Sequence, residues 1–352
     1  MSLSPSHFLF ASLLLSATAA AQIGQLTLSA STGSDPRSVC VIGNNHVVVS
    51  NRIDGWQHFI DVTNPAAPTL TTTFNPPYGD QWFEAEFTSQ WGGRLFTGHR
   101  GGGLNMIDVS NPSSPVTAAS YGSTYHFRGL RFNANSAGGA LYYNETNAGL
   151  QCFGVTSNTL TPVWNAFATN NDANGLEIFR DEIYHFGTPY QNPTTRIVRG
   201  YSLFPNPTSP TQNYFATIPN QASSGHCQLR GQGVVPYILA SRWTDGLQLL
   251  NVSIPTAPVT TPILPANPNL LCWGTMWFPN STFAVAYGSL LIGNTRFYWW
   301  LILSIQPNNV VIPVNVFVVP FDTRDMRADP NTGRIYVTGI DTNSQLGKLL
   351  IY

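Results

Sequence analysis

The sequence has little charge of either sign. Charged residues make up 9% of the 352 residues, lysine occurs only as Lys348, and the formal net charge is -1. Nucleic acids and anionic membranes are bound through an excess of basic groups, which this chain lacks. We therefore expect neither of them as a partner.

Long hydrophobic runs are also missing from most of the chain. After residue 21 the most apolar stretch is 297–305, far short of the roughly 20 residues that a membrane helix needs. Residues 1–21 differ, because they contain no acidic residue, pass through an apolar segment at 8–15 and end on small residues at 17–21. This pattern is typical of a secretory signal peptide. We expect cleavage near Ala20 or Ala21, no membrane span, and a protein that is secreted and extracellular or at the cell surface.

Motifs of metal and cofactor chemistry do not occur. The four cysteines show no CxxC spacing, and we find no zinc-binding helix motif, no calcium loop, no phosphate loop and no nucleophile elbow. The sequence therefore predicts no metal and no cofactor.

An internal repeat is the main positive feature. The segment FIDVTNPAAPTLTTTF at 59–74 recurs as MIDVSNPSSPVTAASY at 106–121 and as LLNVSIPTAPVTTPIL at 249–264. Each copy has an apolar strand, a corner with proline that ends the strand, and a second strand rich in Thr and Val. Two further short apolar runs precede each unit, which gives four strands per period and is typical of a propeller blade.

The period fixes the number of blades. Equivalent residues such as Asp61 and Asp108 are 47 positions apart, and this spacing divides residues 22–352 into seven. The last repeat ends after its third strand, whereas residues 25–32, QLTLSAST, resemble a missing fourth strand. We predict an all-β fold, a single seven-bladed β-propeller domain at 22–352 with four-stranded blades, in which the N-terminal strand completes the last blade. We also expect a monomer.

At these repeats the chain resembles the LVIVD-repeat family of extracellular β-propellers. The match lies at 60–68 and 107–115, with a looser one at 250–258, where an apolar strand is followed by Asp-Val-Ser-Asn-Pro or a variant and then by Ala-Pro or Ser-Pro. The resemblance implies a propeller outside the cell. It implies no common activity, so no functional residue can be carried over.

Candidate site residues follow from the blade alignment, because propellers usually bind ligands at the mouth of the central channel. Polar or aromatic residues are predicted on or just before the inner strands and at the ends of the second strands, where several arginines recur. The proposed substrate-binding residues are Glu84, Arg100, Arg128, His185, Arg242, Trp273 and Arg324, and the proposed catalytic residues are His99, His126, His226 and Tyr125.

Two functions fit these residue types. Arginine offers a rigid fork of donors for carboxylate or phosphate, and tryptophan can stack on a sugar ring, which favours a binding module for an extracellular glycan, an acidic polysaccharide or a protein partner. Alternatively, histidine and tyrosine would serve as base and acid of a carbohydrate-active enzyme. A polysaccharide lyase that cleaves at a uronic acid by β-elimination is then the best candidate, with a glycoside hydrolase as another.

Structural roles compete with these hypotheses. Arginines at the strand ends, including Arg52, can be contacts between blades, the histidines can be hydrogen-bonded core residues, and Trp273 can belong to the core. Asp61 and Asp108 start turns in which a side-chain oxygen accepts from backbone amides, which explains them without a ligand.

The cysteines allow one specific pairing. Cys227 and Cys272 are about one repeat apart, each near the start of an inner strand, so neighbouring blades would bring them together as a disulfide. Cys40 and Cys152 lie inside apolar strands and are expected to be buried thiols.

Overall fold

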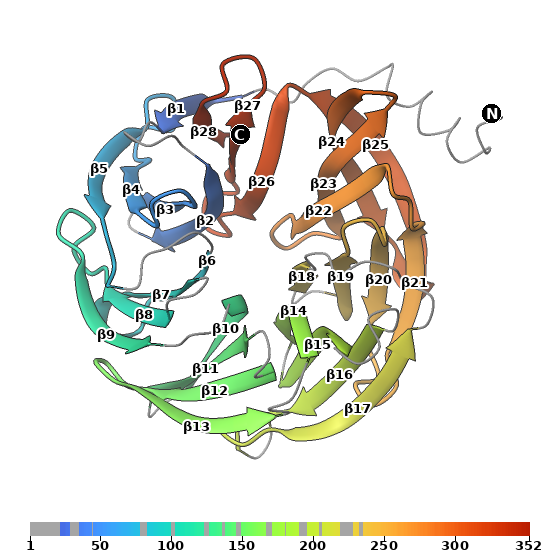
Figure 1. The fold of residues 1–352 in the computed structure, drawn as a ribbon, viewed down its shortest axis with the longest axis horizontal. Helices are drawn as coiled ribbons and strands as arrows, with labels where there is room; N and C mark the ends of the chain where they lie inside the picture. Colours follow the sequence, from blue (N-terminus) through green and yellow to red (C-terminus); the bar gives the residue numbers. More distant parts are fainter. Residues whose placement is uncertain are drawn as a thin grey trace.

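The computed structural model describes residues 22–28, 35–43, 45–77, 83–99, 103–122, 127–135, 138–145, 149–166, 171–179, 181–189, 196–203, 206–218, 228–231 and 235–352. The strands form seven four-stranded antiparallel sheets around a central axis, as Figure 1 shows. The predicted seven-bladed β-propeller is therefore confirmed. No helix in the described part of the chain is long and apolar enough to cross a membrane.

Each blade begins with its inner strand and ends with its outer strand. Blade 1 is β2 (Pro36–Gly43), β3 (His46–Asn51), β4 (Gln57–Asp61) and β5 (Thr69–Phe74). Blade 2 is β6 (Phe83–Thr88), β7 (Arg94–His99), β8 (Gly103–Asp108) and β9 (Val116–Gly122). Blade 3 is β10 (Phe127–Asn135), β11 (Gly138–Glu145), β12 (Gly149–Val155) and β13 (Leu160–Ala166). Blade 4 is β14 (Asn171–Phe179), β15 (Glu182–Pro189), β16 (Arg196–Ser202) and β17 (Thr211–Ile218). Blade 5 is β18 (Gln228–Gly231), β19 (Tyr237–Ser241), β20 (Leu247–Asn251) and β21 (Val259–Leu264). Blade 6 is β22 (Leu270–Trp277), β23 (Phe283–Ile292), β24 (Thr295–Ile305) and β25 (Val311–Val319).

Blade 7 is built from both ends of the chain. It contains β26 (Phe321–Ala328), β27 (Ile335–Asp341) and β28 (Gly347–Ile351), and β1 (Gly24–Leu28) forms its outer strand. The register of β1 and β28 runs from Gly24 opposite Ile351 to Leu28 opposite Gly347. The N-terminal strand thus closes the ring as predicted. A Cβ atom at position 24 would overlap the Pro65 carbonyl oxygen of blade 1, so only glycine fits where the two blades meet.

The repeated aspartates make the turns expected of them. Asp61 Oδ1 accepts from Thr63 N at 2.8 Å, and Asp108 Oδ1 accepts from Ser110 N at 2.9 Å. In blade 5 Asn251 takes the same role with Ser253. These bonds satisfy backbone donors at the strand end, so the signature residues of the repeat shape the turn.

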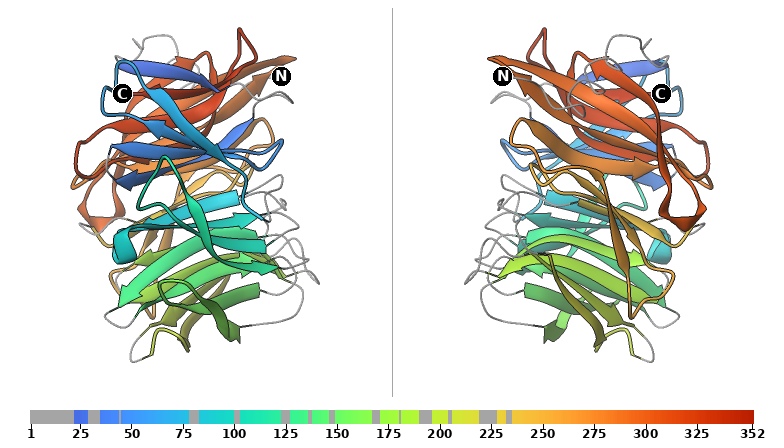
Figure 2. Two further views of the ribbon diagram at one scale, coloured as in Figure 1. Left: turned by 90° about the vertical axis from the view of Figure 1, so that its left-hand side faces the viewer. Right: turned by 90° about the vertical axis from the view of Figure 1, so that its right-hand side faces the viewer.

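Apolar clusters lie between neighbouring blades, and the views in Figure 2 show the blades packed face to face. Phe59 of blade 1 packs with Leu95 and Ile107 of blade 2, and Trp299 of blade 6 packs with Leu239 and Leu249 of blade 5. Cys40 and Cys152 are thiols within such clusters, as expected. Burial of these faces against the next blade holds the ring together.

Candidate functional site

A β-bulge recurs near the start of the inner strands. In β2, β10, β14, β22 and β26 the register with the second strand skips one residue, between Pro36 and Ser38 in β2 and at the corresponding place in the others. The skipped residues are Arg37, Gly129, Asn174, Trp273 and Arg324. A bulge re-aims the side chain of the extra residue and is common beside binding sites.

Three of the bulge residues belong to one group at the end of the channel where the inner strands begin. We call this group the mouth cluster, and it spans blades 5, 6, 7 and 1. Its members are Asp35, Arg37, Arg52, Trp243, Trp273, Asp322 and Arg324.

Asp35 is the centre of the charged half of the mouth cluster. Its Oδ2 atom lies 2.9 Å from Arg37 Nη2 and 3.0 Å from Arg52 Nε, and its Oδ1 atom lies 3.7 Å from Arg324 Nε. Arg324 Nη2 also contacts Asp322 Oδ2 at 2.8 Å. Three guanidinium groups thus face two carboxylates, which leaves the group with one excess positive charge.

The aromatic half adjoins Arg324. The Arg324 guanidinium carbon lies 5.9 Å from the centre of the Trp273 ring, and the rings of Trp273 and Trp243 lie 4.8 Å apart at 53°. Both indoles are half-buried. Backbone hydrogen bonds in both directions between Trp243 and Cys272, each 3.0 Å, hold this pair in place.

Trp243 has a left-handed backbone conformation, with φ of 50°. A bulky residue rarely adopts this conformation, and such strain gathers at functional sites. The turn is supported by Arg242, which is buried and has Nη2 3.5 Å from Asp245 Oδ2.

Several polar atoms of the mouth cluster are buried without a hydrogen-bond partner. They are Trp273 Nε1, Arg324 Nε, Asp35 Oδ1 and Asp322 Oδ1. Burial raises the pKa of Asp322, against the opposing effect of Arg324, and burial together with Arg324 lowers the pKa of Arg37 to about 10. An unpaired buried polar atom costs about 1–3 kcal/mol, so the mouth cluster is held together with part of its hydrogen-bonding capacity unused.

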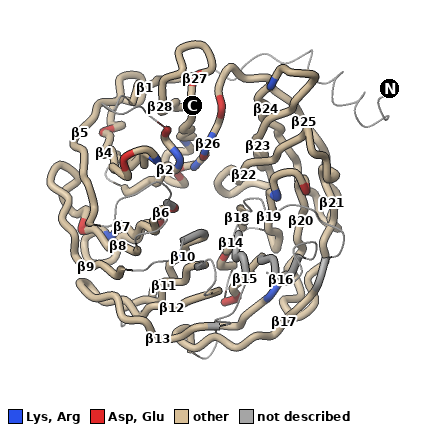
Figure 3. The backbone as a smooth tube through the Cα atoms, in the orientation of Figure 1, with Lys and Arg blue, Asp and Glu red and all other residues tan. Residues whose placement is uncertain are grey.

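A second charged group lies deeper in the ring, where charged residues occupy matching positions of five inner strands. We call these residues, with Glu84 and Asp325, the channel network. The five are Glu86, Arg131, Glu177, Arg230 and Arg327. Figure 3 shows charged residues along the inner strands β2, β6 and β26.

Arg131 joins four blades of this network. It donates to Glu177 through two bonds of 3.2 and 3.0 Å and to the Leu229 carbonyl at 3.0 Å, and it lies 3.7 Å from Glu84 and 3.9 Å from Glu86. Because Leu229 belongs to blade 5 and Arg131 to blade 3, the arginine side chain reaches across the inner strand of blade 4. These contacts satisfy protein groups, so the channel network is a structural tie.

The pKa shifts agree with a buried network. The three nearby carboxylates raise the pKa of Arg131, whereas burial, Arg327 and Arg131 lower the pKa of Arg230 to about 10. Burial raises the pKa of Glu86.

The predicted substrate-binding residues separate into three groups. Trp273 and Arg324 come together in the mouth cluster, and Arg242 supports the turn beside it. Glu84 belongs to the channel network, where Oε2 accepts from Leu130 N at 3.2 Å. His185 is fully buried on β15, with neither ring nitrogen hydrogen-bonded, and burial with the neighbouring Arg199 lowers its pKa to about 3.

Among the predicted catalytic residues only His99 is described. It is fully buried, and Nε2 lies 3.0 Å from Thr97 Oγ1, which favours the structural alternative for this residue. Arg100, Tyr125, His126, His226 and Cys227 and the side chain of Arg128 lie outside the described residues. Their roles, and the pairing of Cys227 with Cys272, stay predictions.

Four of the seven members of the mouth cluster were not predicted from the sequence, namely Asp35, Arg37, Trp243 and Asp322. A usable signal was present, because Asp35-Pro-Arg37 and Asp322-Thr-Arg324 are the same Asp-x-Arg motif at the start of two neighbouring inner strands. The left-handed turn at Trp243 has no such signal.

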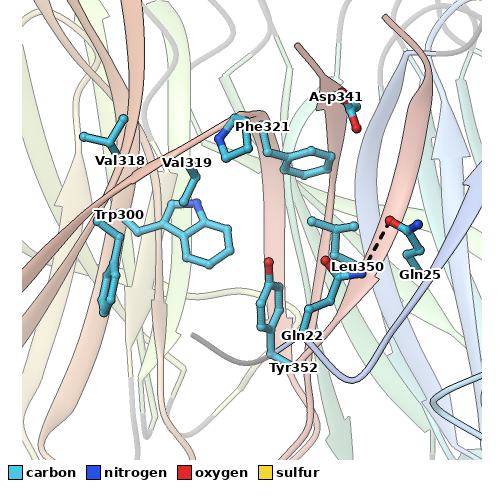
Figure 4. Close-up of a pocket in the computed structure, with 11 residues that line it drawn as sticks. Gln22, Gln25, Trp300, Val318, Val319, Phe321, Asp341, Leu350 and Tyr352 are labelled. Atoms are coloured by element: carbon cyan, nitrogen blue, oxygen red, sulfur yellow. Dashed lines mark hydrogen bonds between the residues drawn. The ribbon is translucent and has the colours of Figure 1, made fainter. Parts of the chain in front are cut away.

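A cavity of about 270 Å³ lies elsewhere, between β24 and β25 of blade 6 and the strands of blade 7. Its wall is mainly apolar and includes Phe317. Figure 4 shows Trp300, Phe321 and Tyr352 in this wall, with Gln22 and Gln25 at one side. Among the residues that the structure describes, Asp341 is the one charged residue that lines it, and Asp341 is paired with Lys348 at 2.6 Å.

Comparison with known proteins supports the fold and the repeat. The LVIVD repeat model matches residues 92–123, which cover most of blade 2, and this agrees with the resemblance seen in the sequence. No curated protein matches the chain.

Solved structures similar to this chain include the structure of U3-55K, at 10% identity and a TM-score of 0.65 over 94% of this chain and 98% of that chain. Sqt1 of Saccharomyces cerevisiae has 11% identity and a TM-score of 0.59 over 94% and 87%, and the RRP9 WD40 repeats have 9% and 0.62 over 93% and 96%. At such low identity these likenesses show the propeller fold alone.

Proposed function

We propose that this protein is an extracellular binding module that recognises a carbohydrate ligand with an anionic group at the mouth cluster. The observation that carries the proposal is the row of bulge residues from three neighbouring blades, Trp273, Arg324 and Arg37, at one end of the channel. The expected signal peptide supports an extracellular location.

The chemistry of the mouth cluster fits such a ligand. Half-buried indoles offer faces on which the apolar face of a sugar ring can lie. Arg324 beside Trp273 offers guanidinium donors to a carboxylate or sulfate, and Nε of this arginine has no hydrogen bond within the protein. Asp35 Oδ1 and Asp322 Oδ1 are buried acceptors without a hydrogen-bond partner within the protein, so reorientation of these side chains on binding would supply acceptors for sugar hydroxyls.

An enzymatic function requires more than the described residues provide. β-Elimination needs a base and an acid near the proton to be removed. His99 is buried, so among the predicted catalytic residues a lyase would depend on His126, His226 or Tyr125. This alternative stays a prediction.

A binding measurement with two variants tests the proposal. Acidic and neutral oligosaccharides of equal length would be titrated by calorimetry against the wild type, Trp273→Ala and Arg324→Gln. We expect each variant to bind the acidic ligand at least tenfold more weakly, because each loses about 1.5–3 kcal/mol of stacking or charge-assisted hydrogen bonding. Arg324→Gln should also abolish the preference for the acidic ligand.

Matched controls are available away from the mouth cluster. Arg334 follows the other end of β26 and donates to the Val62 carbonyl, and Trp164 lies on the outer strand β13. Arg334→Gln and Trp164→Ala should bind within twofold of the wild type. Equal weakening by all four variants, or an unsaturated uronate product in place of stable binding, would count against a binding module at this site.

A further inference from the structure

One long stretch of the chain is almost without charge. Residues 246–321 contain a single charged residue, Arg296, although they include two strands of blade 5 and all of blade 6. In Figure 3 β25 carries no charged residue. A soluble surface is normally rich in mixed charge, so this neutrality needs an explanation.

The outer strand of blade 6 also differs from the other outer strands in exposed apolar side chains. Each of β5, β9, β13, β17 and β21 has one large exposed hydrophobic residue among its described side chains, whereas β25 has three. Ile312 is 49%, Val314 52% and Val318 43% exposed, and Val310 just before the strand is 50% exposed. At nine residues β25 is also the longest outer strand.

An open strand edge accompanies these side chains. β25 pairs only with β24, so its other edge is unpaired. An exposed apolar edge strand without charge is a template for association with another chain. The cavity between blades 6 and 7 continues from this strand, because Val318 and Phe317 line it, and it can receive an apolar side chain of a partner.

We propose that this face, formed by Val310, Ile312, Val314 and Val318 and named here the β25 face, is the interface between two copies of the protein. A partner must itself be neutral and apolar to cover the face without burying an unpaired charge, and a second copy presents such a surface with a matching open edge. A twofold axis at the strand brings the two faces together, which is the commonest form of self-association. Pro313 lacks a donor, so side-chain packing carries the contact.

This inference is independent of the mouth cluster, which lies at the channel rather than at the outer strands. It differs from the sequence-based expectation of a monomer. A dimer joined through β25 leaves both mouth clusters available to a ligand.

Analytical ultracentrifugation of the purified protein tests the proposal. The protein concentration would run from about 1 to about 100 μM, a range that brackets the dissociation constants of weak interfaces. We expect a concentration-dependent dimer for the wild type and at least a tenfold higher dissociation constant for Val314→Lys, because two lysines would meet near the axis. Val318→Lys should act in the same direction. Both positions are exposed, so thermal melting should be unchanged at concentrations where the wild type is monomeric, and should fall only where the wild type is stabilised as a dimer.

Lysine at an exposed apolar residue of another outer strand supplies the control. Val116→Lys on β9 and Val259→Lys on β21 should dimerise as the wild type does. A wild type that is monomeric throughout this range, including one that instead binds neutral lipid vesicles, would overturn the proposal. So would a dimer that Val314→Lys and Val318→Lys leave intact.

Discussion

Replacing Arg131 by methionine should lower the free energy of unfolding by about 3–5 kcal/mol, which is the usual cost of leaving a buried charge without its partner. Arg131 is only 6% exposed and is the common partner of Glu177, Glu84 and Glu86. Without it, three carboxylates would stay close together inside the ring, and the blade 5 carbonyl of Leu229 would lose a donor. Urea unfolding monitored by tryptophan fluorescence measures the change.

Two further variants show whether the network itself is responsible. Arg296→Met removes an exposed arginine of blade 6 and should change stability by less than about 1 kcal/mol. The double variant Arg131→Met with Glu177→Met should recover part of the loss, because one of the uncompensated carboxylates is removed as well. A single variant as stable as the wild type would show that Arg131 does not tie the blades together.

Acid should destabilise the protein through His185. Burial holds the pKa of this histidine at about 3 in the folded state, against 6.5 for an ordinary histidine. The unfolded chain therefore binds a proton as the pH falls below about 6.5, while the folded chain does not. Stability is fully present above this pH, and it falls by about 1.4 kcal/mol per pH unit on the way down to about 3.

The variant His185→Phe isolates this contribution. Phenylalanine has a similar shape and needs no hydrogen bond, so it should remove most of the difference in stability between pH 7 and pH 4. The slope that remains combines His58, whose pKa burial also lowers, with Glu86 and Asp322, whose raised pKa values act in the opposite direction. Unfolding free energies that depend on pH equally in the wild type and in His185→Phe would contradict the buried, neutral state of this residue.

The fold was predictable because its rules are local and repeated. Prolines and aspartates such as Asp61 and Asp108 mark the turn after the third strand in the clear repeats, and the spacing of these turns gives the number of blades. Closure through β1 followed from a missing strand at one end of the chain and a spare one at the other. Neither prediction required knowledge of how side chains pack between blades.

The candidate site was only partly predictable, because it depends on that packing. Trp273 and Arg324 were found since both lie at equivalent points of inner strands. Of the arginines at the ends of the second strands, Arg52 is paired with Asp35 within the mouth cluster and Arg242 with Asp245 beside it, and neither ion pair could be predicted from the repeat. Strand alternation does not reveal that His99 and His185 are fully buried.

The channel network was missed for a related reason. A single charged residue within an apolar inner strand, such as Arg131 in GLRF or Glu177 in GLEIF, has no partner in its own repeat. The ion pairs form between blades, 46 residues apart in the case of Arg131 and Glu177. Only the packing of neighbouring blades around the channel brings these positions into contact.

The mouth cluster is tested most directly by a crystal structure of the protein soaked with an acidic oligosaccharide. The account predicts a sugar ring against Trp273 or Trp243, with its anionic group within hydrogen-bond distance of Arg324. A ligand bound instead in the cavity between blades 6 and 7, or a mouth cluster without ligand at a concentration that saturates binding in solution, would contradict it.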